Sequence, residues 1–353
     1  MTLVIFAITV HLNPVAPHPE TWLQPRPEGL FCLPGGFFID ATRAVDRAII
    51  THGHADHARP GHVHVLASVE TLAIMRARMG EGRAGITQQA LAIGEVLRIG
   101  DVDVSLVPAG HVLGSCQVVM TYQGSRAVVS GDYKRRADPT CAGFVPVACD
   151  VFVTEATFGL PVFRHPDTDK EIAKLLHSMS VFPERPHLIG AYGLGKSQRM
   201  IALLRAAGYD APIYLHGALA KLCDLYGELG IDLGDLRPAT VADKAALRGA
   251  VVIAPPSAVA DRWARRLDDP VVAVASGWMR VRQRAKASGV ELPLIISDHA
   301  DWDELLATVI DVQAPEIWVT HGNEAALIYQ LGLMGRRGRA LSLIGYGDEG
   351  DDA

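Results

Sequence analysis

Short apolar runs rich in β-branched residues recur along the chain, and turns containing Gly, Pro or Asp separate them. Runs of about four to eight such residues between turn signals are typical of buried strands. Residues 68–80 instead have the pattern of a helix, for which Ser68 is the expected N-cap. Helical and strand patterns alternate again over residues 166–285, which predicts a second α/β unit.

Six of the apolar runs lead directly into a histidine or a carboxylate residue. In chain order the residues at these strand ends are His52, His111, Asp132, Glu155, His299 and His321. Chance can place one or two such residues at strand ends, but six are hard to explain in this way. The pattern therefore predicts that loops far apart in the sequence converge on one site.

Residues 48–57 contain the densest group, with three histidines and one aspartate after an apolar strand. Neutral imidazole nitrogen and carboxylate oxygen are the usual protein ligands of zinc and similar divalent metals. Just beyond a strand, His52 and His54 can point one way while Asp56 and His57 point another. This arrangement suits two adjacent metal ions. The alternative, a polar loop with scattered histidines, does not explain so dense a group.

Three further residues extend this site. Asp40 ends an apolar run shortly before the histidine group and could orient a ligand imidazole, although an aspartate in a turn is the alternative. His111 lies between glycines after a strand, and we interpret it as another metal ligand. Asp132 follows the next strand, where its two oxygens are placed to bridge two metal ions.

Composition indicates a soluble globular protein, because apolar residues make up 49% and charged residues 20% of the 353 positions. No apolar run approaches the ~20 residues that span a bilayer. The apolar start, residues 3–10, lacks the basic region of a signal peptide, and we interpret it as a strand or an irregular start. Five cysteines without close pairing favour the reducing cytoplasm. The net charge of −6 argues only weakly against a nucleic-acid ligand, since local charge matters more in a groove.

Residues 190–197 satisfy the P-loop pattern Gly-x-x-x-x-Gly-Lys-Ser. An ATPase would also need a magnesium-binding acid at another strand end, and the available acids already belong to the metal site. We therefore interpret this stretch as a helix N-terminus at which Lys196 and Arg199 face the cleft and hold a phosphate.

A second basic stretch has arginine at alternate positions, namely Arg280, Arg282 and Arg284. In an extended segment these side chains would share one face and could follow the phosphates of a nucleic acid. A solvated strand edge that discourages pairing is the alternative.

The His-x-His-x-Asp-His pattern of residues 52–57 resembles the signature of the metallo-β-lactamase superfamily. That resemblance implies an α/β fold, an αββα sandwich with a dinuclear metal centre at one edge of its two sheets. Glu155, His299 in Ser-Asp-His-Ala-Asp and His321 in Thr-His-Gly are similar to the three extra motifs of the β-CASP branch, whose members are nucleases. The resemblance implies a metallo-β-lactamase domain over residues 1–165 and 286–353, with an inserted α/β β-CASP domain over residues 166–285.

Within this branch the chain looks most like the bacterial ligase-associated DNA exonucleases. The runs that carry this narrower resemblance are residues 27–32, 45–52, 58–62 and 193–199.

The resemblance also implies a role for each site residue. The ligands implied for one metal are His52, His54, His111 and Asp132, and those implied for the other are Asp56, His57, His321 and the shared Asp132. A hydroxide between the metals would attack the phosphodiester. His299, held by Glu155, would bind the phosphate or protonate the leaving group, and Asp40 would orient a ligand imidazole.

We therefore expect a metal-dependent nuclease, a DNA exonuclease of DNA repair that acts on single-stranded DNA together with a DNA ligase or helicase. An RNA-processing ribonuclease of the mRNA 3′-end type is the alternative. A thioesterase or lactamase type of small-molecule hydrolase is less consistent with the long insertion, and a non-catalytic subunit is less consistent with the complete ligand set. Imidazole ligands favour zinc, with manganese as the alternative. The sequence leaves open DNA or RNA, exonuclease or endonuclease action, the polarity of cleavage and the oligomeric state.

Overall fold

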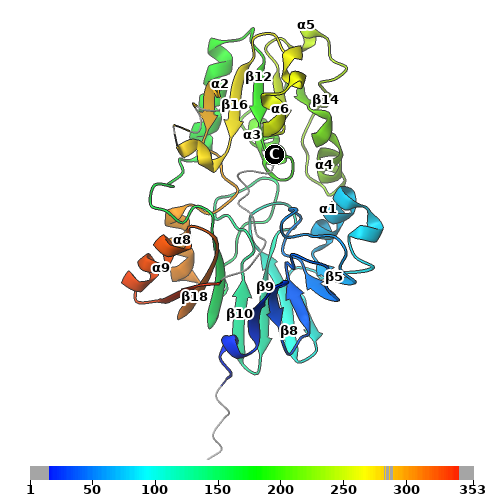
Figure 1. Ribbon diagram of the computed structural model, residues 1–353. Helices are drawn as coiled ribbons and strands as arrows, with labels where there is room; N and C mark the ends of the chain where they lie inside the picture. Colours follow the sequence, from blue (N-terminus) through cyan, green and yellow to red (C-terminus); the bar gives the residue numbers. More distant parts are fainter. Residues whose placement is uncertain (1–15, 282, 284–285, 287–288, 342–353) are drawn as a thin grey trace, which may run out of the picture.

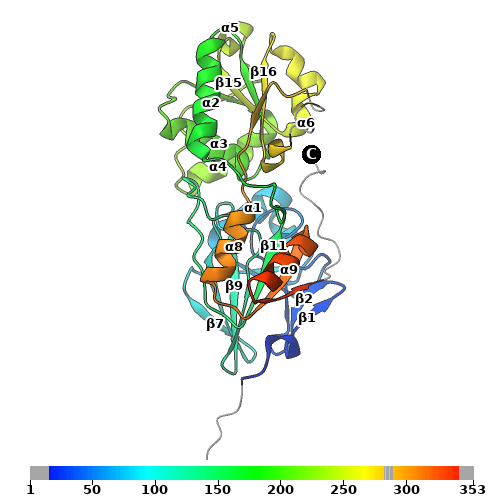
Figure 2. The same ribbon diagram turned by 90° about the vertical axis from the view of Figure 1, so that its left-hand side faces the viewer.

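The computed structural model describes residues 16–281, 283, 286 and 289–341, and its strands form three sheets. Two of the sheets make up the lower lobe in Figure 1, and the third lies in the upper lobe. Figure 2 shows the same two lobes from the side. The expected strand or irregular start at residues 3–10 lies outside the described residues.

The first sheet has six strands in the order β1-β2-β3-β4-β5-β6. β1, β2 and β3 are antiparallel, whereas the pairs from β3 to β6 are parallel. The strands are β1 (Leu23–Arg26), β2 (Gly29–Cys32), β3 (Phe37–Ile39), β4 (Arg47–Ile49), β5 (His64–Ala67) and β6 (Thr87–Ala90).

The second sheet has seven strands in the order β19-β18-β11-β10-β9-β8-β7. Its first four strands in the sequence form an antiparallel meander, and β11, β18 and β19 extend it in parallel. The strands are β7 (Val96–Ile99), β8 (Val102–Pro108), β9 (Cys116–Tyr122), β10 (Ser125–Val129), β11 (Val151–Ala156), β18 (Glu316–Gly322) and β19 (Arg337–Ala340).

These two sheets share one apolar core and are covered by helices on their outer faces. Phe37 and Ile39 of the first sheet belong to the same buried cluster as Val104 and Val118 of the second. α1 (Val69–Met79) covers the first sheet, while α8 (Trp302–Asp311) and α9 (Glu324–Leu333) cover the second (Figure 1). The lower lobe therefore has four layers, helix–sheet–sheet–helix.

The predicted helix at residues 68–80 and its N-cap are confirmed in α1, because the Ser68 hydroxyl accepts a hydrogen bond from the Thr71 amide at 3.1 Å.

The third sheet is entirely parallel, with the order β14-β13-β15-β12-β16-β17. Its strands are β12 (His187–Gly190), β13 (Ile213–Leu215), β14 (Leu236–Pro238), β15 (Val251–Ala254), β16 (Val271–Ala275) and β17 (Leu292–Leu294). The helices of this lobe are α2 (Thr168–Val181), α3 (Lys196–Ala206), α4 (Gly217–Glu228), α5 (Lys244–Leu247) and α6 (Pro256–Val259). The first three pack on one face of the sheet, and α5 and α6 pack on the other. Parallel sheets covered on both faces are the norm in α/β proteins.

Four short 3₁₀ turns are also described: η1 (Pro19–Thr21), η2 (Glu81–Arg83), η3 (Arg262–Arg266) and η4 (Gly277–Arg280).

The two lobes are in direct contact. The main apolar cluster of the third sheet also contains Ile74 of α1 and Leu113 of the β8–β9 loop. We expected the insertion to end at residue 285, but β17 pairs with β16 through Ala273 and Leu292 and therefore belongs to the third sheet. The chain returns to the lower lobe after β17, through the segment that carries His299.

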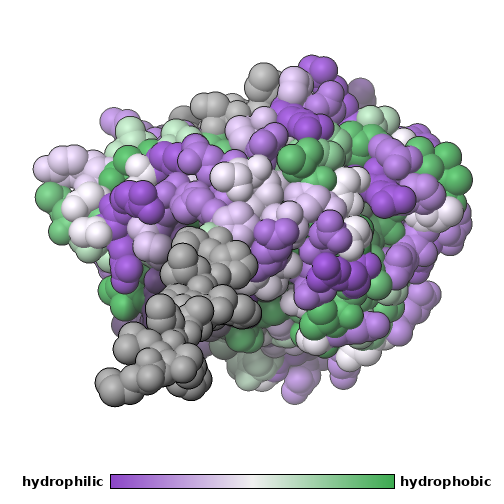
Figure 3. Space-filling model, turned by 90° about the horizontal axis from the view of Figure 1, so that it is seen from below, coloured by the Kyte–Doolittle hydropathy of each residue, from purple (hydrophilic) through white to green (hydrophobic). Residues whose placement is uncertain are grey.

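Among the described residues, no helix is long and apolar enough to cross a membrane. Figure 3 views the molecule from below and shows hydrophobic residues dispersed among hydrophilic ones. Single exposed apolar residues of this kind are ordinary on protein surfaces. The clustered His, Asp and Glu residues lie instead where the two lobes meet.

Candidate metal centre

The expected ligand residues come together at one edge of the two-sheet sandwich, close to the third-sheet lobe. Three groups of His, Asp and Glu residues each bring their ligand atoms within 4.8 Å of one another. The groups are His52–His54–His111–Asp132, His57–Asp132–His321 and Asp132–Glu155–His299. Asp132 belongs to all three and therefore lies at the centre of the site.

In the first group, imidazole nitrogens surround one oxygen of Asp132. His52 Nε2 lies 3.4 Å and His111 Nε2 lies 3.8 Å from Asp132 Oδ2. His54 Nδ1 is 3.0 Å from His111 Nε2. All four residues are buried.

The other nitrogen of each ring faces an oxygen that fixes its orientation. His52 Nδ1 lies 3.0 Å from Thr51 Oγ1, and His54 Nε2 lies 3.1 Å from the Leu194 carbonyl oxygen. His111 Nδ1 lies 2.8 Å from the Asp298 carbonyl oxygen. A ring that donates its N–H to a carbonyl oxygen presents the lone pair of its second nitrogen to the centre, as metal-binding histidines do.

The second group lies on the other side of Asp132. His57 Nε2 is 3.3 Å from Asp132 Oδ2, and His321 Nδ1 is 4.0 Å from Asp132 Oδ1. His57 Nδ1 lies 2.7 Å from Asp40 Oδ2, which makes Asp40 the partner that orients this imidazole. Asp56 contacts His57 at 3.6 Å but falls outside the three groups.

The spacing of these atoms fits a bound cation. Zinc ligands about 2.0–2.1 Å from the ion at tetrahedral angles lie roughly 3.3 Å apart. The nitrogen–oxygen distances of 3.3 and 3.4 Å around Asp132 Oδ2 match this value. Imidazole nitrogen and carboxylate oxygen are also the ligand atoms that zinc and manganese use. The residues present could therefore hold divalent metal ions.

Burial and neighbouring charges shift the pKa values of two residues in the site. Burial raises the pKa of Asp132 above its usual value, although His57 and His299 oppose the shift. Burial alone would lower the pKa of His57, but the carboxylates of Asp132, Asp56 and Asp40 raise it well above normal. A bound divalent cation would favour the anionic carboxylate and the neutral imidazole, because its charge reverses the local electrostatics.

The third group pairs a histidine with a buried carboxylate. His299 Nδ1 lies 3.0 Å from each oxygen of Glu155. Glu155 Oε1 also accepts a hydrogen bond from the Tyr133 amide at 2.9 Å, so this carboxylate is held from two sides. This contact fixes the orientation of the His299 ring through its Nδ1 atom.

Lys196 and Arg199, which we expected to hold a phosphate, pair with carboxylates in the structure. Arg199 is only 1% exposed, and its guanidinium pairs with Asp298 at 3.0 Å and with Asp138 at 3.3 Å. Lys196 Nζ lies 3.2 Å from Asp298. Burial by itself would raise the pKa of Asp298, but Lys196, Lys134 and Arg199 hold it below its usual range. Arg199 is thus part of a buried ion-pair network, whose carboxylates compete with any phosphate.

The second basic stretch is also different from the extended segment that we expected. η4 makes residues 277–280 helical, and Arg280 is exposed at the end of this turn. Arg282 and Arg284 lie outside the described residues. The described part of the stretch therefore does not form the strand that would align its side chains on one face.

The P-loop-like segment has a function in the site that the sequence did not reveal. Its Leu194 carbonyl orients His54, and the Tyr192 ring packs edge-on against His54 at a centroid distance of 5.3 Å. Gly195 lets this segment pack against the β8–β9 loop, because a Cβ at its φ of 87° would lie 2.2 Å from Val112 Cγ1. The glycine spacing was the only sequence signal for this contact.

Aromatic residues beside His299 were also missed. Phe158 lies 6.2 Å from the His299 ring and 4.9 Å from Trp278, measured between ring centroids. Phe163 lies 5.0 Å from Phe158. Phe158 and Phe163 are buried, at 2% and 4% exposure, so these rings pack around His299 as part of the core.

Comparisons with known proteins find relatives that are named as a DNA ligase and as an endoribonuclease. It is 30% identical to a protein from Opitutus terrae named "Probable DNA ligase", over 83% of this chain and 28% of that protein. It is 30% identical to "Endoribonuclease YSH1" from Mycosarcoma maydis, over 58% of this chain and 28% of that protein. The chain therefore spans little more than a quarter of the length of these two relatives.

A shorter relative is covered almost completely. The "Uncharacterized protein in lig 3'region" of Acidianus ambivalens is 30% identical over 40% of this chain and 99% of that protein. A crystal structure of a protein of unknown function from Enterococcus faecalis has a similar fold, with a TM-score of 0.57 and 13% identity over 86% of this chain and 82% of that one. No family model matches the chain.

Proposed function

The chain belongs to the β-CASP branch of the metallo-β-lactamase superfamily, and we propose on this premise that it is a metal-dependent nuclease. The four layers of the lower lobe support an αββα sandwich, and the parallel third sheet supports an inserted β-CASP domain. In this proposal the sandwich comprises residues 1–165 and the chain after β17, with the inserted domain between them.

The observation that carries the proposal is the convergence of two ligand groups on one carboxylate. We assign His52, His54, His111 and Asp132 to one divalent ion and His57, His321, Asp56 and Asp132 to a second. Two such ions, when bound, supply an acidified water as nucleophile and neutralise charge on a phosphate. Zinc suits the imidazole ligands, and manganese is the alternative.

Asp40 and Glu155 would orient imidazole rings, and His299 would bind the substrate. Asp40 keeps the His57 N–H on Nδ1 and so keeps Nε2 available for a metal. Glu155 holds His299 Nδ1 in the same way. His299 thereby presents Nε2 to bind a phosphate oxygen or to give a proton to the leaving oxygen, and the buried carboxylate favours the protonated ring. Hydrolysis of a phosphodiester needs a nucleophile, which water on the bound metals would supply, and a proton for the departing oxygen, which His299 would give.

For the substrate we propose single-stranded DNA, cleaved by an exonuclease that acts in repair beside a DNA ligase. The relative named a probable DNA ligase and the relative named for its position beside a ligase gene region support this choice. The second candidate is an RNA-processing ribonuclease, which the endoribonuclease among the relatives supports.

We further propose a cytoplasmic location, because five free cysteines suit a reducing compartment.

Digestion of end-labelled single- and double-stranded DNA and RNA, with Zn²⁺ or Mn²⁺ added, tests this proposal. We expect single-stranded DNA to be shortened from one end, whereas a ribonuclease would degrade only the RNA. Labelling each end in turn reports the polarity, and internal fragments would indicate an endonuclease. Turnover of a chromogenic lactam or a thioester, with all four nucleic acids intact, would refute the nuclease assignment.

A further inference from the structure

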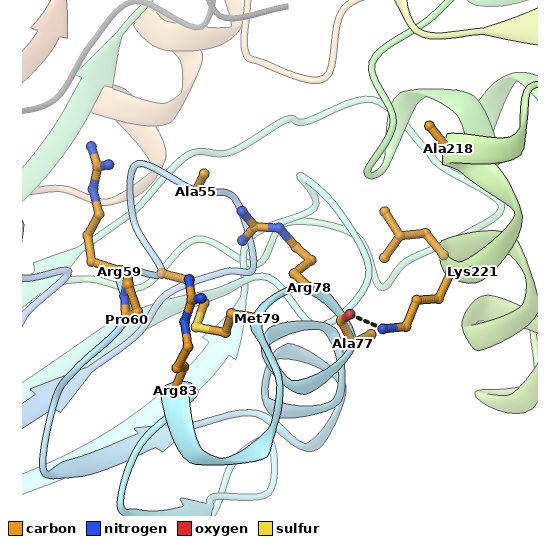
Figure 4. A pocket seen from close by; sticks show the side chains of 11 residues that line it. Ala55, Arg59, Pro60, Ala77, Arg78, Met79, Arg83, Ala218 and Lys221 are labelled. Atoms are coloured by element: carbon orange, nitrogen blue, oxygen red, sulfur yellow. Dashed lines mark hydrogen bonds between the residues drawn. The ribbon is translucent and has the colours of Figure 1, made fainter.

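A pocket of about 410 Å³ opens beside the metal centre, where α1 of the sandwich meets α4 of the third-sheet lobe. Figure 4 shows side chains from the loop after β4, from α1 and η2, and from α4 gathered around it. The cationic residues of its lining are Arg59, Arg78, Arg83 and Lys221.

The pocket lining has four positive charges and contains no acidic residue. Arg78, Arg83 and Lys221 are exposed, and none of these three has a carboxylate within 4.0 Å in the part of the chain that the structure describes. The whole protein carries a net charge of −6, so this concentration of positive charge is local. Like charges gathered around one hollow repel each other, and an anionic ligand would relieve that repulsion.

The wall of the pocket is the loop that carries the metal ligands. Ala55 lines the pocket, and its chain neighbours are His54 and Asp56 of the site. Arg78 donates a hydrogen bond to the Gly53 carbonyl oxygen of the same loop. On the opposite side, Lys221 of α4 donates to the Ala77 carbonyl oxygen of α1, as the dashed line in Figure 4 marks. A ligand in this pocket would therefore touch both lobes and lie next to the metal centre.

We propose that this pocket binds backbone phosphates of the nucleic-acid strand close to the bond that is cleaved. The inference rests on the proposed nuclease function and adds a subsite to it. Arg59 and Arg83 would contact the phosphates together with Lys221, since charged side chains neutralise a strand regardless of its sequence. Apolar lining from Met79 and Leu222 leaves room for the sugars.

Arg83→Gln tests the proposal, because Arg83 is exposed and the structure gives its side chain no role in folding. The probe is a fluorescent single-stranded oligothymidylate with phosphorothioate linkages, which keep the charge and resist cleavage, added to the metal-loaded protein. Each phosphate contact on a single strand changes the slope of log K against log salt by ~0.7, which corresponds to about fivefold in Kd near 0.1 M salt. We expect Arg83→Gln to raise Kd about fivefold and to reduce the slope by about 0.7. Arg83→Glu should weaken binding further.

Arg265→Gln is the matched control, because Arg265 is also exposed but lies outside the pocket, on η3. It should leave both the Kd and the slope unchanged, and thermal unfolding should confirm that all variants are folded. A wild-type Kd and slope for Arg83→Gln would overturn the proposal.

The same experiment separates the pocket from the function on which it rests. If the wild type cleaves ordinary oligothymidylate while Arg83→Gln binds normally, only the pocket proposal fails. If the wild type neither binds nor cleaves any strand, the nuclease function itself fails. Strands with a 5′-hydroxyl and a 5′-phosphate should lose affinity equally in Arg83→Gln, and a loss confined to the 5′-phosphate strand would refute binding of internal phosphates.

Discussion

Replacing Asp40 by asparagine should weaken metal binding although Asp40 touches no metal in the proposed centre. Asp40 is buried, and its carboxylate accepts three hydrogen bonds. Oδ1 accepts from the Thr51 amide at 2.8 Å, and Oδ2 accepts from the Thr51 hydroxyl at 2.6 Å and from His57 Nδ1 at 2.7 Å. An amide of the same shape has one oxygen and one NH₂ group, so it cannot accept all three.

Both orientations of the asparagine amide have a cost. If its NH₂ faces His57, the imidazole must accept at Nδ1 and carry its proton on Nε2, the atom that would bind the metal. If its NH₂ faces the Thr51 amide instead, two buried donors oppose each other, at a cost of about 1–3 kcal/mol. Loss of such an orienting partner typically lowers metal affinity about 10–100-fold, or roughly 1.4–2.7 kcal/mol.

Competition with a chelating dye would measure this loss of affinity, and nitrogen NMR of His57 would report which ring atom carries the proton. The matched control is Asp46→Asn, since the Asp46 side chain is 73% exposed and, among the described residues, forms ion pairs with Arg47 and His64, outside the site. Folded Asp40→Asn protein with wild-type metal affinity would show that Asp40 does not position His57.

Three other substitutions test separate parts of the site. His299→Ala should retain metal but cleave phosphodiesters ~10²–10⁴-fold more slowly; undiminished cleavage, with metal content checked by mass spectrometry, would remove His299 from the mechanism. Asp132→Ala should lose metal and activity together, because Asp132 belongs to every ligand group, and a fully metallated variant would contradict its bridging role. Arg199→Ala should destabilise the fold by about 3–5 kcal/mol, since Asp298 and Asp138 would lose a buried partner; denaturant unfolding measures this, and wild-type stability would refute a structural role for Arg199.

The sequence identified most residues of the candidate metal site, because such residues stand out where a buried strand ends. A strand that is buried needs an apolar run, so a His or Asp directly after it stands out, and strand ends at one edge of a sheet lie close together. His52, Asp132 and His321 could be selected in this way, and the structure brings them together. Their roles as metal ligands remain a prediction that metal analysis can test.

The sequence suggested Asp40 as an orienting partner, which the structure places at His57, but it gave no sign of what orients His54 and His111. The carbonyl oxygens that hold His54 and His111 belong to Leu194 and Asp298, which are 140 and 187 residues away along the chain. Every residue has a carbonyl group, so side-chain type carries no signal for such a contact. The same distance in sequence explains Arg199, whose position after a P-loop-like stretch suggested a phosphate contact, while Asp298 lies 99 residues away.

Local pattern was therefore enough to predict the sheets' apolar cores, the helix at α1 and the identity of the clustered histidines and acids, because each depends on neighbours within one strand or turn. Contacts between distant segments alone decided which carbonyl oxygens orient His54 and His111, that Arg199 is buried against Asp298, and that Arg59, Arg83 and Lys221 surround one pocket. These contacts join segments that only the folded chain brings together. Their energies depend on distance and burial in space, and neither quantity is written in the order of the residues.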